Sequence, residues 1–181
     1  MPTTLHLTRQ KPSPADPTTT ACYNLALETF SPLVSFSAVS WQRRINAQDA
    51  MLFTASLEPD PTTSAEHSHD LIIGFLLTST RQHPELPSPT LHISLAAVAP
   101  SHRRAGIFPR LLAMAEVYAS SSGGAGGEQE LGLGLRGLSI CTLPAKFEGM
   151  YQLLADGRNG WVEVGGREIA DGWQVLFWRG G

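Results

Sequence analysis

The chain has 181 residues, a length that suits one compact domain with its own hydrophobic core. Apolar residues make up 42% of it and charged residues 16%, as in an ordinary globular protein. The formal net charge of −3 excludes a general attraction to nucleic acid or to acidic membranes, so any anion site must be built locally.

The two cysteines, Cys22 and Cys141, lie far apart and form no CxxC or Cys/His ligand pattern. Disulfide scaffolds are short and rich in cysteine, so this usage indicates a reducing compartment. The first ten residues lack the apolar run of a signal peptide, and the longest apolar stretch, Leu71 to Leu77, is too short to span a bilayer. We therefore expect a cytoplasmic protein that does not enter membranes.

The first half of the chain predicts a strand, two helices and three strands. Asp16 and Pro17 mark a helix start, because the carboxylate can cap free N–H groups and proline at the first helical position loses no hydrogen bond. Ser31-Pro32 repeats this signal. The predicted elements are a strand at 5–9, helices beginning near 17 and 32, and strands at 51–57, 71–80 and 91–98.

The second half predicts a helix, a strand, a helix and two closing strands. These are a helix from 107 to 118, a strand at 138–141, a helix at 147–154, and strands at 161–164 and 173–178 that flank a turn-rich segment. Prolines, glycines and polar residues predict flexible loops near 58–70, 81–90 and 120–135. The order indicates a single α+β domain over 1–181, with helices on both faces of a mixed, mainly antiparallel sheet of six to seven strands.

The segment from Ser94 to Leu112 is the most informative part of the sequence. It combines a buried strand, a basic loop with a glycine, and an amphipathic helix that starts beside the loop. Free N–H groups at a helix start, aided by the helix dipole, form a site for phosphate. Gly106 permits a positive φ or the close approach of an anion, and Arg103 and Arg104 add charge that can engage phosphate oxygens.

This segment resembles the acetyl-CoA-binding motif of the GNAT N-acetyltransferase superfamily, Arg/Gln-x-x-Gly-x-Gly/Ala after a strand and before a helix. The residues that fall at the family's spacing are Val98, Pro100, Arg103, Gly106, Ile107, Leu111 and Leu112. The close match spans 94–112, and a looser one continues to 178. The resemblance implies a GNAT-like sheet with a splayed central cleft and acetyl-CoA as acyl donor.

The resemblance also implies the roles of individual residues. Ala96 N–H would bind the acetyl carbonyl oxygen and stabilise its developing negative charge, while Val98 would pair with the pantetheine amide. The residues implied in cofactor binding are Ala96, Val98, Arg103, Arg104, Ala105, Gly106, Ile107 and Phe108. Small residues at 96 and 97 also suit a crowded sheet.

Two residues depart from the family pattern. Phe108 stands at the second Gly/Ala position, so its backbone can donate to phosphate only if its ring points elsewhere, and Pro109 removes one N–H from the first helical turn. The competing interpretation of the loop is a basic helix cap or a nucleic-acid contact. No aromatic platform or broad basic patch lies nearby, which argues against nucleic acid.

The same resemblance implies candidates for the general acid and the general base of the transfer. Tyr151 is the match to the family's tyrosine acid near the thioester sulfur, although Gly160-Trp161 follows later than the family's Gly-Phe; the alternative is a core tyrosine. His92 stands where several acetyltransferases place a glutamate base, and its intrinsic pKa suits that task. An ordinary exposed histidine, with deprotonation by water, is the alternative.

Other groups are weaker candidates for chemistry. The His-rich stretch at 66–70 lacks a third placed ligand, so we predict no metal site. Cys141 follows a strand and could approach the thioester, but no partners for a Cys triad are recognisable.

The sequence therefore predicts transfer of acetyl from acetyl-CoA to an amine by direct attack. A small-molecule acceptor is favoured over a peptide, because no long acidic run suggests a basic tail as substrate. The alternative functions are a catalytically silent acetyl-CoA-binding module and a plain interaction domain. We expect a monomer or homodimer.

Overall fold

The computed structural model describes residues 4–58, 71–122 and 135–180. Within them, seven strands and four α-helices follow the predicted order, with a short 3-10 helix at Pro100–His102. They are β1 (Leu5–Gln10), α1 (Pro17–Phe30), α2 (Ala38–Ile45), β2 (Met51–Leu57), β3 (Leu71–Arg81), β4 (Thr90–Val98), α3 (Ile107–Ser122), β5 (Leu138–Thr142), α4 (Glu148–Ala155), β6 (Val162–Ile169) and β7 (Gly172–Arg179).

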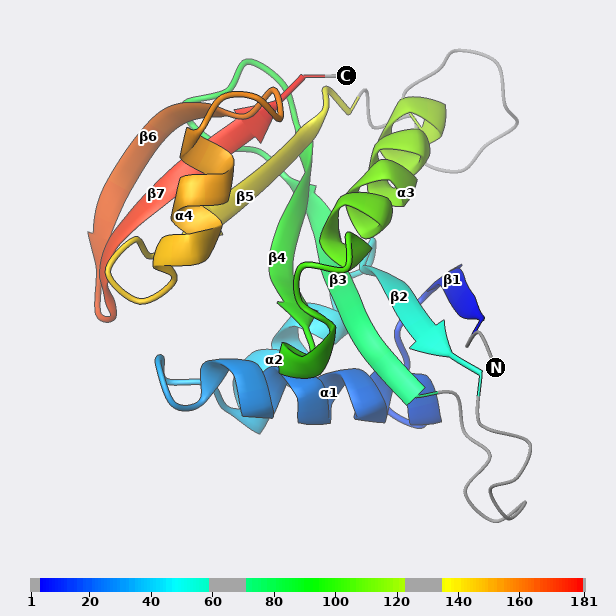
Figure 1. The fold of residues 1–181 in the computed structure, drawn as a ribbon. Coiled ribbons are helices and arrows are strands. Elements are labelled where there is room, and N and C mark those ends of the chain that lie inside the picture. The colour runs from blue at the N-terminus through cyan, green and yellow to red at the C-terminus, as the bar shows by residue number, and fades with distance from the viewer. Residues whose placement is uncertain (1–3, 59–70, 123–134, 181) are drawn as a thin grey trace.

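The strands form one sheet in the order β1-β2-β3-β4-β5-β7-β6. Neighbouring strands are antiparallel, apart from β4 and β5, which run parallel. Helices α1 and α2 contact β3 from one face, and α3 contacts β2, β3 and β4 from the other (Figure 1). The predicted α+β architecture, a mainly antiparallel sheet with helices on both faces, is confirmed.

Side-chain caps fix where the first two helices begin. Asp16 Oδ2 accepts a hydrogen bond from Thr19 N at 3.0 Å, with Pro17 in the first turn as predicted. The second helix begins later than Ser31-Pro32 suggested, because Ser37 supplies its cap: its Oγ accepts from Ser40 N at 3.2 Å. The connection between α1 and α2 is consequently longer than predicted.

Each face of the sheet carries its own hydrophobic cluster. The cluster under α3 and α4 includes Phe53, Leu76, Ile93, Leu111, Leu154 and Phe177. The cluster under α1 and α2 includes Cys22, Leu25, Trp41, Phe75, Leu77 and Ala97. Because β3 and β4 contribute to both clusters, they are the buried centre of the sheet.

The sheet splits between β4 and β5. These strands pair only where Leu91–Ile93 meets Leu138–Ile140, after which β5 remains paired with β7 alone. The split coincides with a bulge at Ser94, where the β3 register steps from Ile93 to Leu95. A bulge increases local twist and turns the strand away. Residues 94–98 therefore have β3 on one side and no strand on the other, which confirms the predicted splayed cleft.

The closing hairpin is longer than predicted. The segment 165–172, expected to be turn-rich, belongs mostly to β6 and the start of β7. A Cβ atom at Gly166 would lie 2.8 Å from the Trp173 ring, so glycine here lets the indole lie flat across the neighbouring strand. Gly166 therefore serves packing within a strand and not a turn.

The loop between β3 and β4 is held by its own contacts. Leu86 N donates to His83 O at 3.0 Å, and both side chains are buried. The predicted loops near 58–70 and 120–135 lie mostly outside the described residues. Among the helices that are described, none combines the length and the apolar character needed to cross a membrane.

Candidate active site

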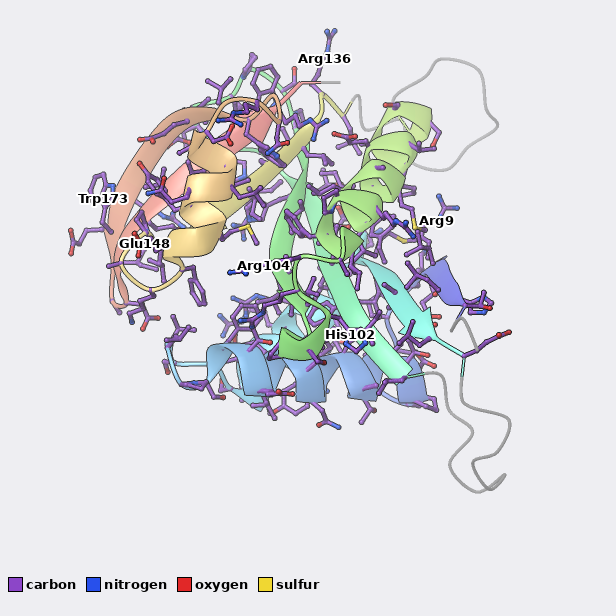
Figure 2. The ribbon with its side chains drawn as sticks, in the orientation of Figure 1. Arg9, His102, Arg104, Arg136, Glu148 and Trp173 are labelled. Atoms are coloured by element: carbon purple, nitrogen blue, oxygen red, sulfur yellow. The ribbon has the colours of Figure 1, made fainter. Side chains whose placement is uncertain are left out.

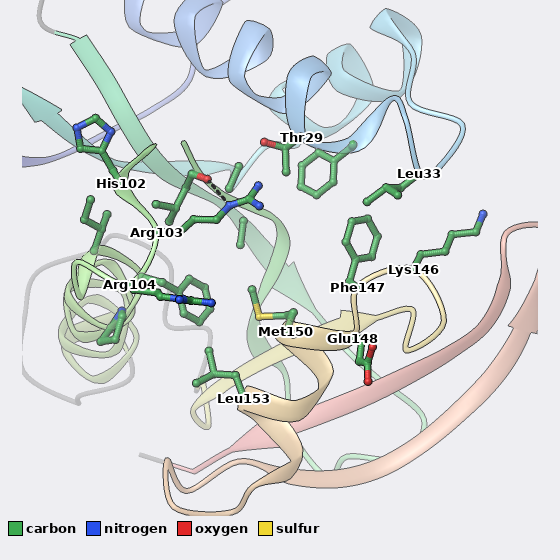
Figure 3. A pocket seen from close by; sticks show the side chains of 18 of the residues that line it. Thr29, Leu33, His102, Arg103, Arg104, Lys146, Phe147, Glu148, Met150 and Leu153 are labelled. Atoms are coloured by element: carbon green, nitrogen blue, oxygen red, sulfur yellow. Dashed lines mark hydrogen bonds between the residues drawn. The ribbon is translucent and has the colours of Figure 1, made fainter. Parts of the chain in front are cut away.

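A cavity of about 710 Å³ lies along the free edge of β4 (Figure 3). Its walls come from the end of α1, from β4, from the turn into α3, and from the segment that leads into α4. Of the residues predicted to bind the cofactor, those that line it are Ala96, Val98, Arg103, Arg104, Gly106, Ile107 and Phe108. Ala105 belongs to the same turn.

The free edge of β4 presents backbone groups to this cavity. On the β3 side, Ala99 N donates to Ile73 O at 2.8 Å. Successive residues of an antiparallel strand point their backbone groups alternately toward and away from the partner. The N–H and C=O groups of Ala96 and Val98 therefore face away from β3. The Val98 carbonyl fits this alternation, since it accepts a hydrogen bond from Arg103 Nε at 3.3 Å.

The turn into α3 has free amides in an unusual backbone conformation. Arg104 and Gly106 have positive φ angles of 66° and 72°. A Cβ at Gly106 would meet no atom within 4 Å, so the space beside it is open. The amides of residues 104–108 form no hydrogen bond with a described residue, and the first bond of the helix runs from Arg110 N to Gly106 O. Such a helix start attracts anions.

The close packing of α3 on the sheet fixes the position of this turn. A Cβ atom on Gly74 of β3 would lie 2.9 Å from Ile107 Cγ2, so the first residue of α3 rests directly on a strand glycine. Ile107 is buried, and the Phe108 side chain packs against the same hydrophobic cluster. Phe108 is thus half-buried, packed against the core while it also lines the cavity, and its backbone role stays a prediction.

Two free cations flank the turn. Arg103 and Arg104 are exposed, and neither forms an ion pair with a described residue. Figure 2 shows Arg104 in the space between the start of α3 and helix α4. Free amides, open space beside Gly106 and two arginines together fit a diphosphate group.

Tyr151 lies on α4 but is not among the residues that line the cavity. Met150 and Leu153, its neighbours on the helix, do line it. The Tyr151 ring is half-buried and packs edge-on against Phe177, with 5.8 Å between ring centroids. The role of Tyr151 as an acid stays a prediction.

His92 is buried on the α1/α2 side of β4 and is also outside the cavity lining. Its Nδ1 lies 3.2 Å from His83 Nε2 and 3.0 Å from Ser139 Oγ. Burial, followed by the charge of Arg81, lowers the pKa of His92 well below 6.5, and burial also lowers the pKa of His83. Both rings are therefore neutral at pH 7. In the contact between His83 Nε2 and His92 Nδ1, one nitrogen donates the hydrogen bond and the other accepts it. His92 as a base stays a prediction.

The sequence did not predict the residues outside 94–112 that line the cavity. They include Thr29, Phe30, Leu33, Lys146 and Phe147. Thr29 Oγ1 is buried and has no hydrogen-bond partner among the described residues. The apolar periodicity of α1 predicted a core helix, and no local signal distinguished its last turn.

Neither cysteine is poised for nucleophilic chemistry. Burial, with a smaller contribution from Asp16, raises the pKa of Cys22 to about 12, and burial raises the pKa of Cys141. Both thiols are therefore protonated at neutral pH. Within 4–58, 71–122 and 135–180, no group of three His, Cys, Asp or Glu side chains could hold a metal ion. The stretch 66–70 lies outside these ranges.

Comparison with known proteins gives a likeness in structure. No protein-family model and no curated protein matches the sequence. Many solved structures are similar to the chain, and several cover nearly all of it. NAA60 of Arabidopsis thaliana with a bisubstrate analogue is 17% identical, covers 97% of this chain and 98% of its own, and has a TM-score of 0.65. That protein was also solved with acetyl-CoA.

Two further structures with this fold were solved with other bound molecules, a peptide with CoA in one and trehalose in the other. The NatC complex bound to Gag peptide and CoA is 12% identical over 97% of this chain and 98% of its own, with a TM-score of 0.63. An aminoglycoside acetyltransferase from an uncultured soil metagenomic sample, in complex with trehalose, is 15% identical over 92% and 95%, with a TM-score of 0.61. A putative acetyltransferase of the GNAT family from Desulfovibrio desulfuricans is 16% identical over 98% and 99%, with a TM-score of 0.64. The chain therefore has the fold of the GNAT N-acetyltransferases.

Proposed function

We propose that the protein is an acetyl-CoA-dependent N-acetyltransferase. One observation carries the proposal: a single cavity is lined both by the turn with unpaired amides, at Arg104 and 106–108, and by Ala96 and Val98, whose backbone groups face away from β3. The turn would hold the diphosphate and the free edge of β4 would pair with the pantetheine arm. Solved structures of the same fold with acetyl-CoA support this assignment.

Bound acetyl-CoA supplies an activated acetyl group as a thioester. The chain's own part is to orient it and to stabilise charge. Ala96 N–H would donate to the acetyl oxygen, where negative charge develops as a neutral amine attacks. Tyr151 would protonate the departing sulfur. His92 would take the amine proton through water, because its ring does not line the cavity.

We propose a small-molecule amine as the acceptor and the cytoplasm as the location. Structures of this fold include complexes with a peptide and with the aminoglycoside sisomicin, so both acceptor classes belong in the test. Incubation with acetyl-CoA and a panel of amines and peptides, followed by release of free CoA thiol, measures the activity. Acetylation of a small amine is expected.

A second candidate is an acetyl-CoA-binding module without activity. It is favoured by one observation, that neither Tyr151 nor His92 lines the cavity. It predicts saturable binding of acetyl-CoA without turnover on any acceptor. A plain interaction domain predicts no thermal stabilisation by acetyl-CoA, whereas a ligand at a hundred times its dissociation constant stabilises by about 2.7 kcal/mol.

A further inference from the structure

The end of the cavity that lies away from the turn at 103–108 carries three large apolar side chains, beside Thr29, Lys146 and Glu148. It is lined by Phe30 from the last turn of α1, by Leu33 from the connection after it, and by Phe147 before α4 (Figure 3). The rings of Phe30 and Phe147 meet edge-to-face with 5.8 Å between centroids. Phe30 is buried, while Leu33 is 44% exposed and leaves apolar surface at the rim. Together these three side chains form an apolar subsite.

The charges around the apolar subsite favour a cation. Lys146 is already paired, with its Nζ 3.1 Å from Asp171 Oδ1. Glu148, in the first turn of α4, is exposed and forms no ion pair with a described residue. Arg103 and Arg104 both come from the turn, and Arg103 Nε is bonded to the Val98 carbonyl (Figure 3). The rim of the subsite thus offers one unpaired carboxylate, which attracts an ammonium ion before it is deprotonated.

The apolar subsite also lies where an acceptor would have to enter. A pantetheine arm that runs from the turn along Val98 to Ala96 would bring its thioester to the middle of the cavity. The remaining space leads to Phe30, Leu33 and Phe147. A polyhydroxylated or multiply charged acceptor would bury polar groups against these side chains without hydrogen bonds, which is costly. The cavity of about 710 Å³ would hold the arm as well as the acceptor, so a compact apolar group would fill the part that remains beside these side chains.

We infer that the acceptor is a small primary amine joined to a compact apolar group, aryl or branched alkyl, with no second charge. This inference rests on the proposed acetyl transfer. The apolar group lies against Phe30, Leu33 and Phe147, and the amine lies beside Ala96. In the transfer, the amine nitrogen forms a bond to the acetyl carbon, the carbon–sulfur bond breaks, the sulfur leaves as a thiolate that takes up a proton, and the nitrogen loses one proton to water.

The test compares 2-phenylethylamine with 2-methoxyethylamine, a polar amine of the same chain type, and adds sisomicin and a tetrapeptide that begins with phenylalanine. We expect kcat/KM for 2-phenylethylamine to exceed that of 2-methoxyethylamine and of sisomicin by at least about tenfold, as expected for apolar groups in an apolar pocket. Equal values, or a preference for sisomicin, would overturn the inference. A tenfold preference for the peptide would overturn its small-molecule part.

Variants separate the apolar subsite from the cofactor site. Phe147→Ala should lower kcat/KM for 2-phenylethylamine about tenfold and leave that for 2-methoxyethylamine within about twofold. Phe147→Leu, which keeps an apolar side chain, serves if the alanine variant is unstable, and its loss should be smaller. Trp173→Ala, an exposed aromatic on β7, is the matched control and should change neither rate. Equal losses for both amines in Phe147→Ala would contradict the inference.

A binding measurement distinguishes failure of this inference from failure of the proposed transfer. Calorimetry of the protein saturated with CoA should show 2-phenylethylamine binding at least about tenfold more tightly than 2-methoxyethylamine. If the aryl amine binds in this way but is not acetylated, the subsite stands and the transferase proposal falls. If acetyl transfer to other amines occurs while the aryl amine binds no better than the polar one, the transferase stands and the subsite falls.

Discussion

Arg103 Nε donates a hydrogen bond to the main-chain carbonyl of Val98, with 3.3 Å between the two atoms (Figure 3). The carbonyl is one of the groups proposed to pair with pantetheine, and the guanidinium is one of the cations proposed to hold diphosphate. Binding of acetyl-CoA would therefore move the Arg103 side chain from the Val98 carbonyl to the diphosphate. The side chain is exposed, so the exchange costs little.

Arg103→Ala should affect two ligands differently. Affinity for acetyl-CoA should fall about tenfold, because a charge-assisted contact to diphosphate is lost. Acetyl-pantetheine, which lacks the diphosphate, should bind as well or about twofold more tightly, because the Val98 carbonyl is already free. Calorimetry with both ligands measures this, and Arg136→Ala removes an exposed arginine elsewhere as the control (Figure 2). Equal losses for both ligands would show that Arg103 does not contact the diphosphate.

Two substitutions at Gly106 separate the effect of a negative charge from the effect of a side chain of the same size. Any side chain at its φ of 72° should cost about 1–2 kcal/mol of stability, so Gly106→Gln and Gly106→Glu should unfold at similar temperatures. Their side chains would enter open space beside the turn. Only the glutamate places a like charge next to the diphosphate, and it should weaken acetyl-CoA binding at least about a hundredfold relative to the glutamine variant. Equal affinities in the two variants would show that the diphosphate does not bind at this turn.

The contact between Gly74 and Ile107 should transmit changes in β3 to the turn. Gly74→Ala would place a methyl group 2.9 Å from Ile107 Cγ2, and the stiff β-branched side chain cannot yield easily. We expect a loss of about 1–3 kcal/mol of stability together with weaker acetyl-CoA binding.

A double variant tests the cause of that loss. Ile107→Ala removes the clashing methyl group, so Gly74→Ala in that background should cost at least about 1 kcal/mol less than in the original chain. Chemical denaturation of the four proteins gives the coupling free energy. Additive losses would mean that the two residues do not meet in this way.

The turn at 103–108 could be predicted from the sequence because its signals are local. A strand end, a glycine and the periodicity of the following helix all lie within one short stretch, and they predict free amides beside cations. The opposite end of the cavity could not be predicted. Phe30 and Phe147 meet only because the sheet brings α1 and the β5–α4 connection together, and each residue alone has the pattern of an ordinary core position.

The direction of His92 shows a second limit of sequence reasoning. Counting alternate residues back from Val98 places His92 on the same face of the strand. The bulge at Ser94 inserts one residue, so His92 instead shares a face with Leu95 and Ala97, under α1 and α2. A bulge has no reliable sequence signal, and one extra residue moves every earlier side chain of the strand to the opposite face of the sheet.

Tyr151→Phe tests the proposed acid. The ring would keep its edge-on packing against Phe177, so stability and acetyl-CoA affinity should be unchanged. Loss of a general acid should lower kcat by about a hundredfold or more. Tyr118→Phe, a half-buried tyrosine on α3 that packs against Phe53, is the matched control. A rate equal to that of the original chain would remove Tyr151 from the mechanism and leave it as a packing residue.

The buried pair His83 and His92 should make folding stability depend on pH. Both pKa values are lowered by burial, so between the usual value of 6.5 and the lower folded values the unfolded chain binds more protons than the folded one. The free energy of unfolding should therefore fall as pH drops below 6.5, by up to about 1.4 kcal/mol per pH unit for each ring. Urea denaturation between pH 5 and 7.5 measures the slope. His92→Gln keeps a group that can bond Ser139 but cannot titrate, so it should remove the part of the slope that comes from His92. An unchanged slope in that variant would mean that His92 is charged or exposed in the folded protein.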